Sequence, residues 1–233
     1  MKIGNLDIDK SPRICISIPI GLSNKINDDI KYADLIEARI DYSKNKNVGF
    51  IKEELEKLSK YNKPIIITNR KKYEGGAFDG TDEERIEIME SLMNSADCID
   101  CIDIELSTES RIAGRLILHA RSMGIKTIIS HHDFNRTPSD EDIRNIINRE
   151  LDFGDIAKIA FKINDAEDIL RIYGISLEIS NDRSKPIISI PMGHPIARIA
   201  GILFRSQILY AGNIAPGQLS ARNIRDILDV CNM

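Results

Sequence analysis

Eight short runs of β-branched and other apolar residues recur along the chain, and they constrain its fold more than any other feature. Each run has the four to six residues typical of a buried β-strand. They are Ile14–Ile18, Leu35–Ile40, Pro64–Thr68, Cys101–Ile104, Thr127–Ser130, Ile156–Phe161, Pro186–Ile190 and Gln207–Tyr210. Over 233 residues their mean spacing is close to the roughly 30 residues of a βα unit. The chain therefore predicts strands alternating with helices.

Helix starts fall between these runs. Thr81-Asp-Glu-Glu84 and Ser139-Asp-Glu-Asp142 are typical N-terminal capping sequences, and each precedes isoleucines or methionines at helical spacing. Because no linker rich in Pro, Gly or Ser interrupts the alternation, we expect an α/β protein with a single (β/α)₈ TIM barrel, one catalytic domain spanning residues 1–233.

The nearest competitor is an open α/β sheet that binds a nucleotide. Such a sheet is expected to carry GxGxxG or GxxxxGK[ST] after a strand, and neither pattern occurs here. The first strand runs instead into Pro19-Ile-Gly-Leu-Ser23. The barrel is favoured.

The charges of the chain predict a small-molecule partner. The formal net charge is −4, and no basic block marks a nucleic-acid or membrane-binding surface. No apolar run approaches the roughly 20 residues of a membrane span, and residues 1–10 lack the apolar region of a signal peptide. We expect a soluble, cytoplasmic protein without nucleic-acid or membrane partners.

The four cysteines predict free thiols. They are too few for a disulfide scaffold, and although Cys98 and Cys101 form a CxxC, alternating apolar residues place them in a strand and its lead-in. The chain has four histidines and no HExxH, so we predict no metal site.

Charged residues gather where strands end, which is where TIM barrels place their functional groups. They are Glu37, Arg39, Asp41, Arg70, Glu74, Asp103, Glu105, His131, His132, Lys158, Lys162, Arg198 and, with an amide, Gln218. A spacing of two puts Glu37, Arg39 and Asp41 on one strand face, although Asp41 can equally be a turn residue. The set indicates either a structural ion network or a site for an anionic ligand.

Adjacent strand residues point to opposite faces, so at most one of His131 and His132 can face the barrel axis. Lys158 lies mid-strand in a strand that helices cover outside, so its amine must point inward. An inward lysine near other cations loses its proton more easily and can attack a ketone, whereas the structural alternative is a lysine that neutralises Glu105 or Asp103. Lys162 shares the same parity, and spacing alone does not choose between the two lysines.

An ordered set of motifs gives the chain its family resemblance from Ile14 to about Leu228. The motifs are Glu37-Ala-Arg-Ile-Asp41, Arg70-Lys-Lys-Tyr-Glu-Gly-Gly76, Ile129-Ser-His-His-Asp-Phe134 with Thr137-Pro138, Lys158-Ile-Ala160, Met192-Gly193 with Arg198-Ile-Ala-Gly201, and Ala215-Pro-Gly-Gln218. The chain resembles the type I 3-dehydroquinate dehydratases of the shikimate pathway, whose fold is a (β/α)₈ barrel.

The resemblance implies conversion of 3-dehydroquinate to 3-dehydroshikimate plus water, without metal or cofactor. It makes Lys158 the imine-forming residue, His132 the general acid/base and Glu74 the carboxylate that orients this histidine. The remaining substrate-binding positions are Arg198 and Gln218 for the carboxylate, Glu37, Arg39 and Arg70 for the hydroxyl-bearing side, and Met192 and Tyr210 as walls. A homodimer is also implied.

The chain departs from the family pattern in three places. Tyr210 stands where the family usually carries Phe, Ile214 replaces a serine that touches substrate, and the loop from Met192 to Arg198 is two residues shorter than in familiar members. Loss of that serine hydroxyl removes one hydrogen-bond donor, worth roughly 1 kcal/mol. The alternative enzymatic hypothesis is a Schiff-base aldolase on the same barrel type, and the non-enzymatic one is a binding or structural barrel.

Overall fold

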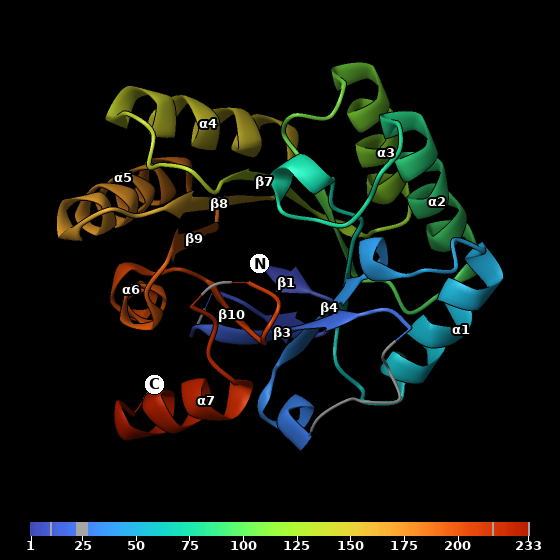
Figure 1. The fold of residues 1–233 in the computed structure, drawn as a ribbon, viewed down its shortest axis with the longest axis horizontal. Helices are drawn as coiled ribbons and strands as arrows, with labels where there is room; N and C mark the ends of the chain where they lie inside the picture. Colours follow the sequence, from blue (N-terminus) through green and yellow to red (C-terminus); the bar gives the residue numbers. More distant parts are fainter. Residues whose placement is uncertain (10, 22–27, 216, 233) are drawn as a thin grey trace.

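The eight predicted strands form one parallel sheet that curves into a nearly closed barrel in the computed structural model (Figure 1). The structure describes residues 1–9, 11–21, 28–215 and 217–232; Leu22 and Ser23 after the first run, and Pro216 within the last motif, lie outside this part. The strands are β3 (Arg13–Pro19), β4 (Leu35–Arg39), β5 (Ile65–Thr68), β6 (Cys101–Glu105), β7 (Lys126–Asp133), β8 (Ile156–Lys162), β9 (Ile187–Met192) and β10 (Ile208–Ala211).

Helices follow the strands and cover the outside of the barrel, as the alternating pattern predicted (Figure 1). The α-helices are α1 (Val48–Ser59), α2 (Asp82–Ser95), α3 (Ser110–Ser122), α4 (Asp140–Phe153), α5 (Ala166–Arg183), α6 (Pro195–Ile199) and α7 (Ala221–Val230). The 3₁₀ helices are η2 (Asp28–Tyr32), η3 (Ile40–Tyr42), η4 (Lys72–Glu74) and η5 (Ala200–Phe204). The predicted caps are confirmed, since Thr81 accepts a hydrogen bond from the N–H of Glu84 and Ser139 from that of Asp142.

Residues along each strand alternate between the helices and the barrel axis. At the N-terminal end of the barrel the inward residues are apolar. They include Cys15, Leu35, Ile66, Cys101, Ile128, Ile156, Ile188 and Ile208. The next inward layer is polar on β3, β4, β7 and β8, where the register pairs Ser17 with Glu37 and Ser130 with Lys158. The barrel thus has an apolar floor beneath a polar rim.

A short antiparallel hairpin, β1 (Lys2–Ile3) and β2 (Leu6–Asp7), adds to this floor and lies near the centre of Figure 1. Ile3 and Ile8 are fully buried among the inward residues. Gly4 makes the turn with a φ of 54°, and a Cβ there would lie 2.5 Å from the carboxylate of Asp100. The sequence did not predict this hairpin, because strands of two residues carry no readable periodicity.

The sheet order runs from β10 through β3 to β9, without a ladder between β9 and β10 among the described residues. At that seam the Gln207 N–H lies 3.5 Å from the Ile187 carbonyl, and Ser206 accepts a hydrogen bond from the Ser189 N–H at 3.2 Å. A serine hydroxyl therefore replaces part of the backbone ladder where the barrel closes.

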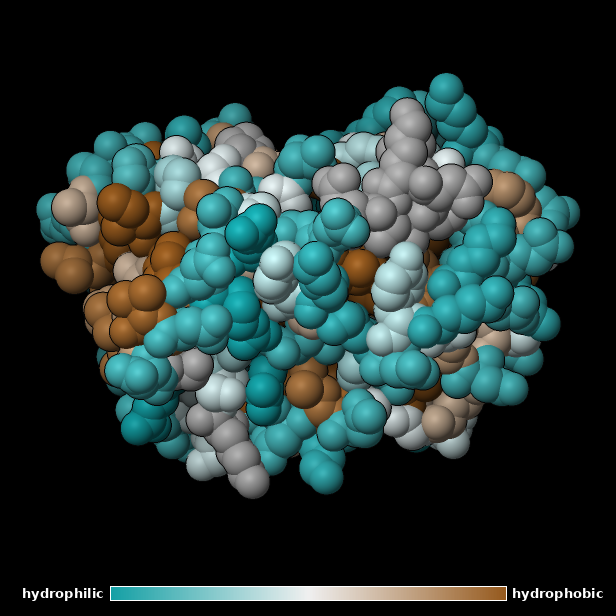
Figure 2. Space-filling view, turned by 90° about the horizontal axis from the view of Figure 1, so that it is seen from below, coloured by the Kyte–Doolittle hydropathy of each residue, from teal (hydrophilic) through white to brown (hydrophobic). Residues whose placement is uncertain are grey.

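The surface is mostly hydrophilic, and hydrophobic side chains gather at the left of Figure 2, on the side where α5 and α6 lie in Figure 1. Leu170, Ile196 and Leu203 are 64%, 72% and 72% exposed. In the described part of the chain no helix is long and apolar enough to cross a membrane.

Candidate active site

The polar rim surrounds a cavity, partly open to solvent, at the C-terminal ends of the strands. All ten residues that the family resemblance assigned to the site line it. They are Glu37, Arg39, Arg70, Glu74, His132, Lys158, Met192, Arg198, Tyr210 and Gln218. Ser17, Ile190, Ile214 and the aromatic ring of Phe134 complete the wall with three small residues, Gly75, Ala160 and Ala215.

Lys158 projects inward from the middle of β8 and is 2% exposed. Its Nζ lies 2.7 Å from Asp103 Oδ2, 3.4 Å from Glu37 Oε1 and 4.0 Å from the centre of the Tyr210 ring. The expectation of cationic neighbours is wrong for the atoms in direct contact, which are carboxylates and an aromatic face. The structural alternative, an ion pair with Asp103, is thus present as well, and the amine lines the cavity all the same.

Lys162 ends β8 and is exposed, outside the residues that line the cavity. Its side chain lies beside the next loop, since a Cβ on Gly193 would be 3.1 Å from its Nζ. Strand parity left both lysines open, and depth separates them: only Lys158 reaches the enclosed part of the barrel.

Asp103 connects the charged side chains of the site to one another. It accepts hydrogen bonds from Lys158, from Arg70 Nη2 at 2.7 Å and from the Ser130 hydroxyl at 2.7 Å. Burial alone would raise the pKa of this carboxyl, but Arg70 and Lys158 hold it well below its usual range. A carboxylate with three donors is fixed in place, and it fixes the lysine in turn.

Glu37 forms the opposite wall. Its carboxylate accepts hydrogen bonds from the Ser17 hydroxyl at 2.6 Å and the Thr68 hydroxyl at 2.9 Å. Burial opposes ionisation, but Lys158 and Arg39 keep its pKa below the usual value. Both carboxylates beside Lys158 are therefore charged at neutral pH.

Arg39 is held by Asp41 through two hydrogen bonds of 2.9 and 2.8 Å. Asp41 lies in η3, after β4 has ended at Arg39, so it is the turn residue that the sequence left as one of two possibilities. It also accepts a hydrogen bond from the Ala77 N–H at 2.9 Å. This carboxylate thus joins Arg39 to the glycine turn that carries Glu74.

Glu74 ends η4 and is 3% exposed. The chain turns sharply after it, because Gly75 has a φ of 75° and a Cβ on Gly76 would lie 2.1 Å from the Arg70 carbonyl. Burial raises the pKa of Glu74 to about 7, and the negative charge of Glu105 adds to the effect.

His132 faces the cavity, whereas His131 points outward and packs edge-on against Phe161 at 6.1 Å. The prediction that the adjacent histidines face opposite ways is confirmed. His132 Nδ1 lies 3.2 Å from Glu74 Oε2. Burial, with Arg70 and Lys158 nearby, lowers the pKa of His132 well below 6.5, so its imidazole is neutral and can accept a proton.

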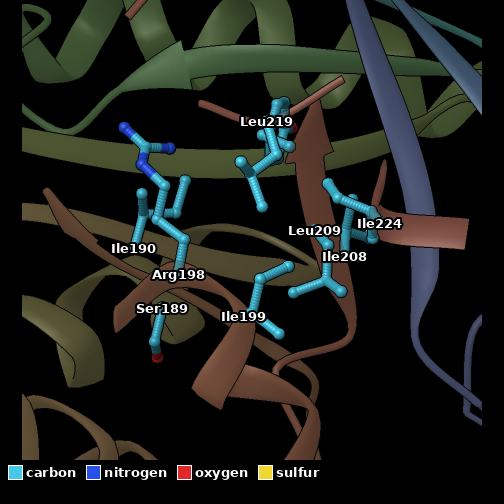
Figure 3. Close-up of a pocket in the computed structure, with 9 residues that line it drawn as sticks. Ser189, Ile190, Arg198, Ile199, Ile208, Leu209, Leu219 and Ile224 are labelled. Atoms are coloured by element: carbon cyan, nitrogen blue, oxygen red, sulfur yellow. The ribbon is translucent and has the colours of Figure 1, made fainter. Parts of the chain in front are cut away.

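Arg198 enters the cavity from α6, on the seam side. The Tyr173 hydroxyl donates to the Ala197 carbonyl at 2.7 Å, and His194 caps the helix by accepting from the Ile196 N–H at 3.2 Å. Burial lowers the pKa of Arg198 to about 10, which still leaves the guanidinium charged at neutral pH. A smaller, mostly apolar pocket lies below it, and in Figure 3 the guanidinium points away from the apolar side chains of Ile199 and Leu209.

Gln218 uses its carbonyl oxygen to hold its own loop, accepting from the backbone N–H groups of Ile214 and Ala215 at 2.8 Å each. Its amide NH₂ is then the part that can donate to a ligand. Ile214 also lines the cavity and brings an apolar surface where the family resemblance placed a hydroxyl.

Sequence reasoning missed Arg85, a fully buried arginine on α2. It contacts Glu105 and donates to the Asn69 carbonyl at 3.0 Å, which anchors the loop before Arg70. A signal was present, because Arg85 falls on the same helical face as the buried Met89 and Leu92. A charged residue within an apolar stripe indicates a buried ion pair.

No metal-binding group of three or more His, Cys, Asp or Glu side chains occurs among the residues that the structure describes. All four cysteines are free, with Cys101 buried in β6 and Cys98 just before it.

Comparison with known proteins places the chain in a family. Residues 14–233 match the family model of type I 3-dehydroquinase. The chain is 38% identical over 203 residues to a 3-dehydroquinate dehydratase of Methanobrevibacter smithii, covering 86% of this chain and 85% of that protein. It is 36% identical over 230 residues to one of Methanococcus maripaludis, covering 93% and 99%.

A solved structure extends the likeness to the fold. The type I 3-dehydroquinate dehydratase of Clostridium difficile, crystallised with covalently modified comenic acid, superposes with a TM-score of 0.90 at 28% identity, covering 99% of this chain and 96% of that chain. The prediction of a TIM barrel and the family resemblance are both confirmed.

Proposed function

The chain belongs to the type I 3-dehydroquinase family, and from this premise we propose that it removes water from 3-dehydroquinate to give 3-dehydroshikimate through an imine on Lys158. The observation that carries the proposal is the meeting of Lys158, His132 and Arg198 in one cavity. These side chains supply a nucleophile, a proton carrier and a carboxylate anchor. The whole of residues 1–233 is proposed to work as one catalytic domain.

Imine formation is the first step of the proposed mechanism. The Lys158 ammonium and the substrate ketone give a protonated imine and one water, so that a C–N bond forms, the C–O bond breaks and charge is conserved. The protonated imine withdraws electrons, and loss of a proton from the neighbouring carbon then gives an enamine. Asp103, at 2.7 Å from Nζ, balances the positive nitrogen before substrate arrives.

His132 is proposed to carry that proton. Its Nδ1 faces Glu74, so Nε2 is the atom that acts on substrate. When the enamine expels the hydroxyl, His132 returns a proton and water leaves. Hydrolysis of the imine releases product and restores the Lys158 ammonium, which closes the cycle without metal or cofactor.

Substrate binding follows from the remaining side chains. We propose that Arg198 and the Gln218 amide hold the carboxylate, while Glu37, Arg39 and Arg70 contact the hydroxyl-bearing side. Met192 and Tyr210 form apolar walls for the ring. Arg39 and Arg70 are already engaged by Asp41 and Asp103, so they offer donors in fixed positions.

Incubation of the purified protein with 3-dehydroquinate tests the proposal. We expect a product with the mass of substrate minus one water, identical in chromatography to 3-dehydroshikimate, and the same rate after EDTA treatment. Cleavage of a keto acid into two carbon fragments without dehydration would instead support an aldolase. No turnover of 3-dehydroquinate by the folded protein contradicts the proposal.

We further propose a homodimer in the cytoplasm. The exposed Leu170, Ile196 and Leu203 on and beside α5 and α6 are candidates for burial against a second copy. Four free cysteines are typical of a reducing compartment. Sedimentation of the purified protein measures the oligomeric state, and a monomer at micromolar concentration would contradict the dimer.

A further inference from the structure

Glu74 has a second hydrogen-bonded side, away from the histidine. Its Oε1 accepts from the Ser107 hydroxyl at 2.5 Å. The Ser107 oxygen lies 2.9 Å from the Tyr73 hydroxyl, which in turn receives a hydrogen bond from Lys71 Nζ at 2.8 Å. A chain of four side chains thus runs from the rim to the carboxylate that faces His132.

The direction of this chain follows from its inner end, where the Ser107 hydroxyl donates its only proton to Glu74. The Lys71 ammonium, ion-paired with Asp82 at 2.6 Å, can only donate, so the Tyr73 oxygen accepts from it. Because the Ser107 proton is given to Glu74, the Ser107 oxygen can only accept from the Tyr73 hydroxyl. Every hydrogen bond in the chain points toward Glu74, which favours its carboxylate form.

We propose that Ser107, aligned by Tyr73, is a positioning residue for the dehydration. By donating to Glu74, the Ser107 hydroxyl keeps this carboxylate an acceptor for Nδ1–H of His132. The Nε2 atom of His132 then stays free to take the substrate proton. The inference rests on the proposed function of His132. In the alternative state Glu74 is a carboxylic acid that donates to Nδ1 of His132. The imidazole proton then sits on Nε2, and this atom cannot take a proton from the substrate.

The loop that carries Ser107 is well supported. It follows β6 directly, the Leu106 N–H donates to the Ser130 carbonyl at 2.8 Å, and the Thr108 N–H donates to the Glu105 carbonyl at 3.0 Å. Buried Arg85 holds the Thr108 hydroxyl at 2.6 Å. Ser107 itself is exposed, so its hydroxyl can be removed without opening a hole in the core.

The surroundings of Glu74 determine in which direction its pKa moves when Ser107 is changed. Burial and the negative charges of Glu105 and Asp103 on β6 raise this pKa. The Ser107 hydroxyl and Arg70, which follows β5, lower it, and the net value is about 7. His132 on β7 faces its other oxygen. Loss of the Ser107 hydroxyl raises this pKa further, so the active form appears only at higher pH.

Ser107→Ala is compared with Ser107→Thr by measuring kcat/KM against pH. We expect the acid limb of the Ala profile to move up by about one pH unit, with an approximately tenfold loss below the limb that narrows as pH rises. Ser107→Thr keeps the hydroxyl and restores the profile. Tyr73→Phe shifts the limb in the same direction by less.

A second readout does not depend on turnover. In ¹⁵N-histidine spectra of the ligand-free protein, His132, assigned by its absence in His132→Asn, is expected as the Nδ1–H form at pH 8 and to move toward Nε2–H in Ser107→Ala. An unchanged acid limb together with an unchanged tautomer overturns the role of Ser107. If wild type fails to turn over 3-dehydroquinate, the proposed function fails, and the tautomer alone then decides whether Ser107 orients Glu74.

Discussion

From β4 to β8 most inward side chains above the apolar floor are charged or polar and bonded to one another, whereas on β9 and β10 the corresponding positions carry Ile190, Met192 and Tyr210. On the charged wall, Asp103 joins Lys158, Arg70 and Ser130 in one network. On the seam side the strands meet through Ser206 and Ser189 beside an apolar cavity (Figure 3).

The difference separates two tasks. Buried charges are stable only when several partners fix them, so the wall holds its groups at set positions suited to bond making. The seam has fewer such constraints and is where α6 brings in Arg198. We therefore expect changes on the wall to affect the chemical step, and changes at the seam to affect substrate binding or stability.

Lys158→Ala is expected to have the largest effect. Without the amine no imine forms, and turnover falls on the order of 10⁴-fold or more, as for other lost nucleophiles. Borohydride added with 3-dehydroquinate should label the Lys158 peptide of the wild type and nothing in the variant. Mass spectrometry of the digested protein measures both.

Lys162→Ala is the matched control, because this lysine shares the strand and the parity but lies exposed at the rim. It should keep both turnover and labelling. Lys158→Met, which preserves side-chain volume, separates lost chemistry from lost folding. An adduct on Lys162, or turnover without any adduct, would rule out the assignment.

His132→Ala comes next, with an expected loss of about 10²- to 10⁴-fold in kcat, the usual contribution of a general acid/base. His131→Ala should change kcat little, since that ring packs on Phe161 outside the cavity. Steady-state kinetics compares the two. Equal losses of kcat in the two variants would mean that both substitutions disturb the packing of β7, and that His132 is not the proton carrier.

Arg198→Ala tests the seam. Loss of one charge-assisted contact to a carboxylate is expected to lower kcat/KM by roughly 10- to 100-fold, mainly through KM, while labelling of Lys158 persists at saturating substrate. Arg205→Ala is the control, because this exposed arginine near the seam contacts Asn181 and does not line the cavity. A collapse of kcat with KM unchanged would assign Arg198 to the chemistry instead.

The same division explains what the sequence could predict. The alternation of strands and helices located all eight barrel strands to within about two residues at most ends, because the core fixes strand periodicity. Strand parity also oriented His131 and His132 correctly. Local pattern was sufficient wherever a residue's surroundings come from its own strand and the helices that cover it.

Partners distant in sequence were harder to predict. Parity could not give depth, so Lys158 and Lys162 stayed equivalent, and it could not show that Asp103, 55 residues before Lys158, is the direct contact of that amine. Ser107, in the loop after β6, and Tyr73, in η4 after β5, are 34 residues apart and meet only because parallel strands end at the same rim.

Tyr210→Phe is expected to have the smallest effect and the opposite sign. The Tyr210 hydroxyl is buried and has no hydrogen-bond partner among the residues that the structure describes, although its ring lies under Lys158. Removing an unsatisfied hydroxyl while keeping the ring should stabilise the protein by about 1 kcal/mol, or about 2–4 °C in Tm for a chain of this size. The ring stays under the amine, so labelling of Lys158 should be retained.

Tyr173→Phe is the matched control, because that hydroxyl donates to the Ala197 carbonyl at 2.7 Å and its loss should destabilise the protein by a similar amount. Thermal unfolding of both variants measures the pair. A lower Tm for Tyr210→Phe would mean that the seam, like the wall, fixes its polar groups with partners.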